Sequence, residues 1–257
     1  MFVLGLCFGS FVNMLIYRVA INYKLKKTTF AKATASQRRS FCDYCGRQLG
    51  WYENIPVISW VIQKGKTRCC GKKLSVLYPV VEMLMGALFV INYLVGVIHK
   101  SPLHLILGLV IIVFLVFSGM FDLKFMILPD FSTVILVICA LALWFIRNTE
   151  QWNYFWSSIL SFGFLGLLYL ITKKKGIGFG DVKLAIFMGL FLGYPKIIVA
   201  FYIAFVVGAI VSLVLIFFKK ASRKTQIPFG PFLIFGTLIA WWWGNLILGL
   251  SVFQFIR

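Results

Sequence analysis

The sequence predicts an all-α, polytopic membrane protein with about eight transmembrane helices and a cytoplasmic loop similar to a zinc knuckle. Of its 257 residues, 61% are hydrophobic and only 13% are charged, which is typical of a chain that lies in a lipid bilayer. Most of its apolar runs have the ~20 residues that a helix needs to cross ~30 Å of hydrocarbon. The runs cover residues 1–19, 76–98, 103–121, 131–147, 154–172, 182–194, 197–218 and 229–250.

The first run is expected to anchor the chain with its N-terminus outside, because no basic stretch precedes it and no small-residue cleavage signal follows it. The sixth run is shorter than the rest, since Gly189 lies inside it and Pro195 ends it. We therefore divide the chain into a first transmembrane helix at 1–19, a basic, cysteine-bearing cytoplasmic loop at 20–75 and a core of seven helices at 76–257.

The distribution of basic residues supports this orientation. Alternating spans place most of the 26 lysines and arginines in or beside cytoplasmic segments, as expected for short loops that resist translocation. The exceptions are Lys100, Arg147, Lys196 and Arg257. Topology and contact with anionic lipid account for the net charge of +19, so a bilayer and not a nucleic acid is the predicted partner.

Asp122 and Asp181 each lie at the inner end of an apolar run, in a chain with only seven acidic residues. An ionised carboxylate beside hydrocarbon is costly and is by default a sign of function. Two carboxylates that share a site cannot both ionise easily, so one keeps a proton while the other activates water, without a metal ion. The pair predicts an aspartic catalytic site. The alternative is a transporter that relays protons or cations, although such relays usually lie near the midplane.

Other polar and small residues near this boundary are candidates for substrate binding. Gly178 and Gly180 let the backbone before Asp181 approach an extended substrate closely. Lys183 is expected to pair with lipid phosphate or with the site, unless it serves only the topology. Glu82 is expected to position the substrate or to hold spans together.

Helix positions also follow from small residues and prolines. Gly5 and Gly9 in the first run favour close packing against a neighbouring helix. Pro228, Gly230 and Pro231 begin the last run, and they predict a bent start that places this helix against the catalytic group.

Four cysteines in the cytoplasmic loop predict a structural zinc site. Cys42 and Cys45 are two residues apart and precede a glycine, a turn that aims both sulfurs at one ion. Cys69 and Cys70 are adjacent, so both reach one metal less easily than a second spaced pair, which leaves the fourth ligand open. A remnant of such a site, or unliganded thiols, are the alternatives, and a cytoplasmic location disfavours a stable disulfide.

Together these motifs resemble those of the type IV prepilin peptidases, a family of GxGD intramembrane aspartic peptidases. The resemblance covers nearly the whole chain as an ordered series. Its parts are Gly9-Ser-Phe-Val-Asn13, Tyr17-Arg18, Cys42 to Cys45, Glu53-Asn-Ile-Pro56, Ser59, Cys70-Gly71, Leu74-Ser75, Tyr78-Pro79, Glu82, Asp122, Ile127-Leu-Pro-Asp130 and Gly178-Phe-Gly-Asp181 with Val182-Lys183. The family commonly has a second CxxC, and Thr67 stands where its first cysteine would lie.

The resemblance implies an activity, a substrate and a second cofactor. The helical core would be an endopeptidase that removes the short, basic leader of prepilins or pseudopilins at the cytoplasmic face, typically between Gly and Phe. Many family members also methylate the new N-terminal amine with S-adenosylmethionine. This sequence has no GxGxxG motif between a strand and a helix, which would indicate a Rossmann-type methyltransferase. Because the inner face is itself basic, we expect the apolar part of the substrate to enter laterally from the membrane.

Overall fold

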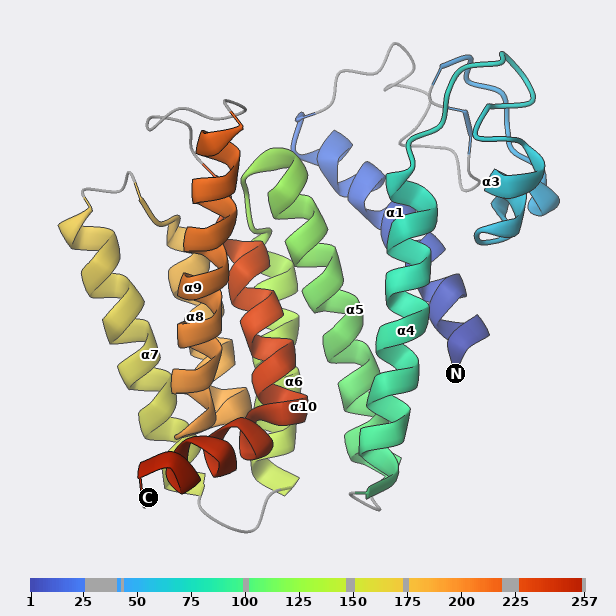
Figure 1. Cartoon of the computed structure of the whole chain (residues 1–257). Coiled ribbons are helices and arrows are strands. Elements are labelled where there is room, and N and C mark those ends of the chain that lie inside the picture. Colours follow the sequence, from blue (N-terminus) through green and yellow to red (C-terminus); the bar gives the residue numbers. More distant parts are fainter. Residues whose placement is uncertain are drawn as a thin grey trace. The chain divides into compact units, whose positions relative to one another are not determined.

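The computed structural model describes residues 1–25, 41–42, 44–98, 102–146, 151–172, 176–218 and 227–255. All eight apolar runs are helical, and six of these helices are long and apolar enough to cross a membrane. The prediction of an all-α, multi-pass membrane protein is thereby confirmed. The helices are α1 (Phe2–Asn22), α4 (Leu77–Ile98), α5 (Pro102–Phe125), α6 (Asp130–Ile146), α7 (Gln151–Ile171), α8 (Phe179–Leu192), α9 (Lys196–Phe217) and α10 (Gly230–Phe255) (Figure 1).

The chain divides into two compact units, unit 1 from Met1 to Val113 and unit 2 from Phe114 to Arg257. Unit 1 contains α1, α4 and the connection between them, which holds the 3-10 helix η1 (Trp51–Asn54) and the short helix α3 (Ile58–Ile62). No strand occurs among the residues described. Two isolated antiparallel bridges join Phe41 to Gln48 and Lys66 to Lys73.

Helices α1 and α4 pack backbone to backbone within unit 1 (Figure 1). A Cβ atom on Gly5 would lie 2.6 Å from the carbonyl oxygen of Met85, and one on Gly9 would lie 2.5 Å from the Cα of Glu82. The Asn13 amide also donates a hydrogen bond to the Tyr78 carbonyl oxygen at 3.2 Å. The close packing predicted from the small residues of the first span is therefore confirmed.

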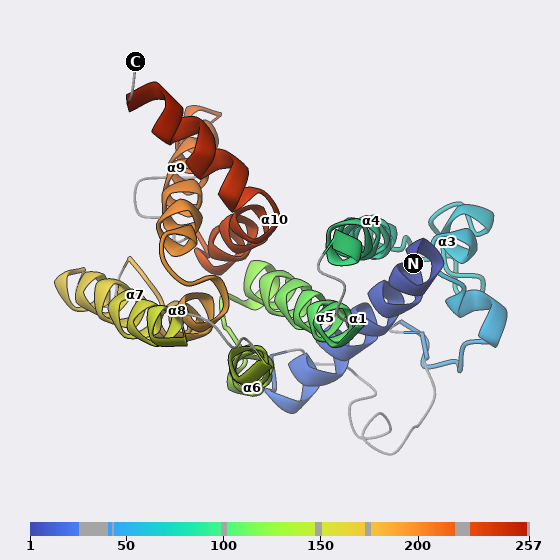
Figure 2. The same cartoon turned by 90° about the horizontal axis from the view of Figure 1, so that it is seen from below.

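Helix α8 is the centre of unit 2, where it contacts α6, α7, α9 and α10. Ten of its residues are buried, from Asp181 to Leu192, because its sequence is apolar around the whole circumference. The hydroxyls of Ser158 and Ser161 on α7 donate to carbonyl oxygens of α8 at 3.0 and 2.8 Å. The view of Figure 2 shows α7 running alongside α8, and α9 alongside α10.

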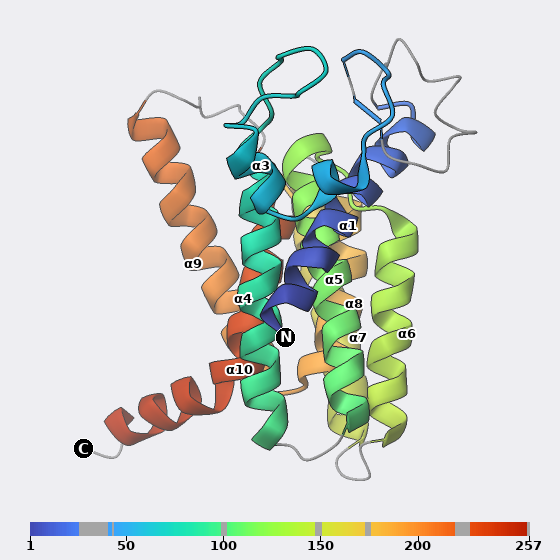
Figure 3. The same ribbon diagram turned by 90° about the vertical axis from the view of Figure 1, so that its right-hand side faces the viewer.

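Three helix ends of unit 2 frame the candidate site. The last turn of α5, the first turn of α8 and the first residue of α10 hold Asp122, Asp181 and Gly230 respectively. From its start at Gly230, α10 runs through the unit and then turns sharply in its C-terminal half (Figure 3). Helix α5 is tied to the start of α6 by a 2.9 Å hydrogen bond between Ser118 and Ser132.

Candidate active site and cysteine cluster

Asp122 is a buried carboxylate on the last turn of α5. Its side chain is 6% exposed, and its Oδ2 accepts a hydrogen bond from the Gly230 N–H at 3.1 Å. This donor belongs to the first residue of α10, where backbone N–H groups have no partner within the helix. As the pattern around Pro228 and Pro231 predicts, the start of the last helix lies against the aspartate.

Asp181 is held by the N-terminus of its own helix. Its Oδ2 accepts the Gly178 N–H at 3.0 Å, and its own N–H donates to the Gly178 carbonyl oxygen at 3.1 Å. A carboxylate in the first turn of a helix also interacts favourably with the positive end of the helix dipole. Asp181 is 5% exposed, so the sequence around Gly178 folds into a cap that fixes a buried acid.

The two carboxylates face the same small space beside the backbone of Gly230. A Cβ atom on Gly230 would lie 2.6 Å from Oδ2 of Asp122 and 3.3 Å from Oδ1 of Asp181. Oδ1 of Asp181 is buried and has no hydrogen-bond partner among the described residues. Unit 2 thus brings together the two aspartates that the sequence singles out, and only a glycine at position 230 leaves this space open.

The glycines before Asp181 make close contacts within the chain itself. A Cβ atom on Gly180 would lie 2.8 Å from the Cβ of Leu128, while one on Gly178 would lie 3.3 Å from the Asp181 carboxylate. Position 180 therefore requires a small residue for the packing of α8, and a larger residue at position 178 would press on the Asp181 carboxylate. Their predicted contact with an extended substrate stays a prediction.

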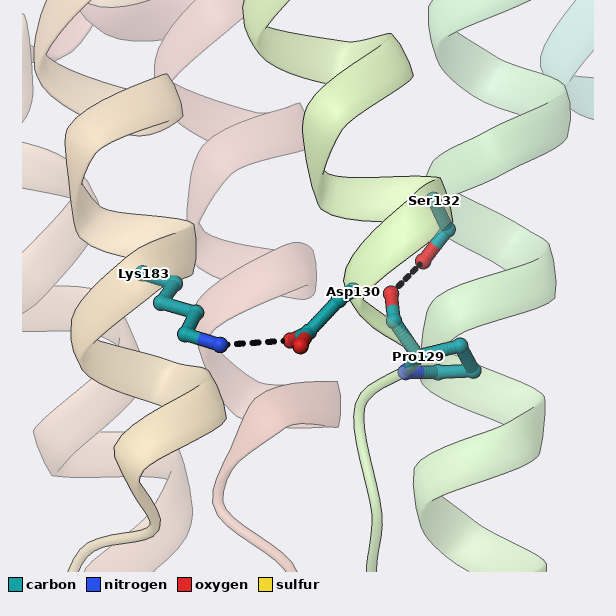
Figure 4. Close-up of polar contacts among 4 residues, drawn as sticks. All are labelled: Pro129, Asp130, Ser132 and Lys183. Atoms are coloured by element: carbon teal, nitrogen blue, oxygen red, sulfur yellow. Dashed lines mark hydrogen bonds and ion pairs between the residues drawn. The ribbon is translucent and has the colours of Figure 1, made fainter. Parts of the chain in front are cut away.

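Lys183 pairs with Asp130 across the space between α8 and α6 (Figure 4). Its Nζ lies 2.7 Å from Oδ1 of Asp130 and 5.0 Å from the centre of the Phe179 ring. The side chains are 33% and 68% exposed, so this pair is partly solvated. Ser132, whose hydroxyl donates to the Pro129 carbonyl oxygen at 2.7 Å, fixes the turn that presents Asp130.

Two turns of the same design carry the four loop cysteines. The first residue is Cys42 in one turn and Thr67 in the other. In each turn its N–H donates a hydrogen bond of 2.8 Å to the carbonyl oxygen five residues later. The N–H of the turn glycine donates back to the first residue, at 3.0 Å in one turn and 2.9 Å in the other. These glycines, Gly46 and Gly71, have φ values of 72° and 66°, which only glycine adopts readily. Thr67 thus occupies in the second turn the place of Cys42 in the first.

The sulfur atoms of Cys42, Cys45, Cys69 and Cys70 all lie within 4.8 Å of one another. The Cys42–Cys70 pair is 3.9 Å apart, the Cys69–Cys70 pair 4.0 Å and the Cys45–Cys69 pair 3.2 Å. A tetrahedral site with Zn–S bonds of ~2.3 Å has sulfur–sulfur edges of about 3.8 Å. The cluster therefore fits one metal ion, and Cys69 supplies the sulfur that Thr67 lacks.

The surroundings of these thiols set which of them lose a proton easily. A hydrogen bond with the Thr67 hydroxyl lowers the pKa of Cys70 to about 7. The hydrogen bond between Cys45 and Cys69 raises the pKa of Cys69 to about 12, and burial raises the pKa of Cys42. Because zinc binds thiolates, metal binding would release protons from Cys42 and Cys69.

Glu82 lies in unit 1, on α4, and is 6% exposed. Its Oε2 accepts the Val57 N–H at 2.7 Å, which ties the connection after η1 to the helix. The same carboxylate lines a cavity of about 630 Å³ formed by α1, α4 and the connection between them. No sequence motif marks this cavity, because its lining residues are spread from Cys7 to Glu82.

Apolar helices around two buried aspartates that face one space are the arrangement expected of a polytopic membrane protein of the aspartic peptidase class. Comparison with protein families agrees with this class. The model of the Bacterial Peptidase A24 N-terminal domain matches residues 3–95, and that of the Type IV leader peptidase family matches residues 109–213.

Curated relatives match the chain over nearly its whole length. A prepilin leader peptidase/N-methyltransferase of Stutzerimonas stutzeri is 30% identical, covering 99% of this chain and 93% of the relative. Proteins of the same name from Legionella pneumophila and Bacillus subtilis are 31% and 27% identical, covering 95% and 98% of this chain and 90% and 96% of the relatives. No solved structure matches. The chain therefore belongs to the prepilin leader peptidase/N-methyltransferase family.

Proposed function

We propose that the chain is an aspartic endopeptidase that removes the basic leader of type IV prepilins or pseudopilins. The observation that carries this proposal is the convergence of Asp122 and Asp181 on one space beside Gly230. The family membership and the names of the relatives support the substrate class.

The geometry suits water-mediated peptide hydrolysis by a pair of acids. The carboxylates are buried, at 6% and 5% exposure, and they face one space beside Gly230, so ionisation of one acid disfavours ionisation of the other. The charged acid takes a proton from water, whose oxygen attacks the scissile carbonyl carbon. The protonated acid donates to the carbonyl oxygen, and a proton then reaches the leaving amine as the C–N bond breaks. Each acid accepts one hydrogen bond from a backbone N–H, so these bonds do not distinguish the two. Because the acids titrate as one coupled unit, neither is assigned as the charged or as the protonated acid.

The site is proposed to face the cytoplasm. Asp122 lies at the end of α5, and Asp181 and Gly230 lie at the starts of α8 and α10, so all three belong to helix ends that the distribution of basic residues places inside. The same argument supports an outer N-terminus, and the membrane is proposed to be the cytoplasmic (inner) one. Lys173, Lys174 and Lys175, part of this inner charge, lie outside the described residues.

The cysteine cluster is proposed to hold a structural zinc ion. Four sulfurs within 4.8 Å of one another are the donor set that zinc prefers, and no step of the hydrolysis above uses them. The ion would join the two loop turns to each other and so stabilise unit 1.

The proposed function is tested by coexpression with a candidate prepilin. Asp122→Asn and Asp181→Asn keep the shape of the side chain but cannot provide the charged acid, so we expect unprocessed prepilin to accumulate with either variant. The matched control is Asp130→Asn, which changes a carboxylate that is 68% exposed and should retain processing. Normal processing by both dyad variants, at wild-type protein levels, would refute the proposed catalytic pair.

A further inference from the structure

The short helix α3 of unit 1 turns its apolar side chains outward. Ile58, Val61 and Ile62 have the spacing of one helix face, and they are 56%, 59% and 62% exposed. Ser59 and Gln63, which share another face, line the cavity of unit 1. A helix on a water-exposed surface has the reverse distribution, with its apolar face packed inward. The exposed apolar face of α3, formed by Ile58, Val61 and Ile62, therefore calls for a partner other than water.

The neighbouring 3-10 helix η1 exposes aromatic side chains as well. It packs against α3, and Trp51 within it is 81% exposed. The ring of Tyr52 meets that of Trp51 edge to face at 6.0 Å. Tryptophan and tyrosine are enriched at the boundary between hydrocarbon and water, where the ring is in an apolar environment and its polar atom stays hydrated. The exposure of Trp51 suits a side chain at this boundary.

A hydrogen bond sets the level of α3 along the membrane-spanning helix α4. Val57, which precedes α3, donates its N–H to Oε2 of Glu82 at 2.7 Å. Glu82 follows Leu77, the first residue of α4, by five positions, which is about 7.5 Å along the helix axis. Figures 1 and 3 likewise show α3 beside the upper end of α4.

Helix α4 needs nearly its whole length to cross a bilayer. It has 22 residues, so it is about 33 Å long, against ~30 Å of hydrocarbon. The first residue of α4 therefore lies close to the boundary between headgroups and acyl chains. Because α3 begins about 7.5 Å further along the axis, it lies at the depth of 5–10 Å that is typical of helices in the lipid interface.

Basic side chains follow the exposed apolar face directly. Lys64, Lys66 and Arg68 are all exposed, and the guanidinium carbon of Arg68 lies 5.2 Å from the centre of the Tyr52 ring. Cations at the membrane surface are attracted to anionic headgroups. An apolar face flanked by lysine and arginine is the pattern of helices that lie in the plane of a membrane.

We propose that α3 lies in the lipid interface beside α4, with Ile58, Val61 and Ile62 among phospholipid acyl chains and the basic residues after it at the headgroups. The connection between α1 and α4 is then a membrane-anchored element, and α3 holds one wall of the cavity of unit 1 at the membrane surface. This proposal requires that α4 spans a bilayer, and it does not depend on peptidase activity.

Photocrosslinking to lipid tests the position of α3. Purified full-length protein is reconstituted in vesicles of phosphatidylethanolamine and phosphatidylglycerol with radiolabelled acyl chains, and a benzophenone amino acid takes the place of Ile62. After ultraviolet irradiation, we expect bound lipid within about twofold of that from the same substitution at Val80, an exposed residue of α4. The control position is Lys72, an exposed residue of the turn that carries Cys69 and Cys70, and it should capture about fivefold less lipid.

Three results would overturn the proposal. Lipid capture at position 62 below half of that at position 80 would place α3 in water. A crosslink between two copies of the chain would make the exposed apolar face an interface between copies. A crosslink to prepilin added to the vesicles would make it a substrate surface. If the variant at position 62 does not fold, the same substitution of Ile58, on the same face, decides by the same comparison.

Discussion

Replacing Gly230 with alanine tests the shared space of the two aspartates directly. The added Cβ would lie 2.6 Å from Oδ2 of Asp122, whereas ordinary contact begins at 3.4 Å, so the acid or α10 must move by about 0.8 Å. The Cβ would also lie 3.3 Å from Oδ1 of Asp181. Misplacing reacting groups by ~1 Å costs roughly 100-fold in rate, or about 2.7 kcal/mol. We therefore expect kcat for leader cleavage to fall by about this factor.

The assay is cleavage of a purified prepilin at saturating concentration, with the amount of folded enzyme measured in the same membranes. Gly166→Ala is the matched control, because its Cβ would meet only Val182, at 3.8 Å, within the same unit. We expect this control to cleave at the wild-type rate. A Gly230→Ala enzyme within twofold of wild-type kcat would show that the space between the carboxylates is not used in the reaction.

Three further changes probe the packing, the ion pair and the cysteine cluster. Gly189→Ala should lower the free energy of unfolding by about 1–3 kcal/mol, because its Cβ would overlap the α7 backbone, and a thermal melt in detergent without any shift would contradict this. Lys183→Met should cost less than about 1 kcal/mol of stability in the same melt, since its partner Asp130 is largely exposed; a larger loss would show a stronger ion pair. Cys69→Ser should abolish zinc in elemental analysis, and adding Thr67→Cys should restore it by placing a sulfur at the position equivalent to Cys42; retained zinc in the single variant would exclude Cys69 as a ligand.

Most of the fold follows from hydropathy alone, because a bilayer requires long apolar helices whose length and spacing are visible in the chain. The predicted runs end within a few residues of the observed helices, as at 76–98 against Leu77–Ile98. The short run at 182–194 gave the weakest signal and forms the central helix of unit 2. With 14 residues, α8 is surrounded by other helices, so protein and not lipid covers its sides.

The acidic side chains of the candidate site could be predicted from the sequence, because acidic residues are rare in this chain. The backbone groups of the site were harder to predict. Asp122 and Asp181 stand out in a chain with seven acidic residues. The hydrogen bond from the Gly230 N–H has no side-chain signature, although the prolines around it predicted a bent helix start at this place. Spacing left the fourth ligand of the predicted zinc site open, because the position of the Cys69 sulfur depends on the turn that begins at Thr67, whose hydrogen bonds match those of the turn that begins at Cys42.

The Asp122 carboxylate accepts its backbone hydrogen bond from a residue that is made 108 positions later in the chain. A ribosome inserting this protein therefore releases α5 and α8 into the bilayer well before the helix that carries the donor to the first acid. Until α10 has been synthesised and inserted, the nascent chain contains Asp122 and Asp181 but lacks the Gly230 N–H that donates to Asp122. In the order of synthesis, the hydrogen bond from Gly230 to Asp122 is therefore among the last contacts of this site that can form.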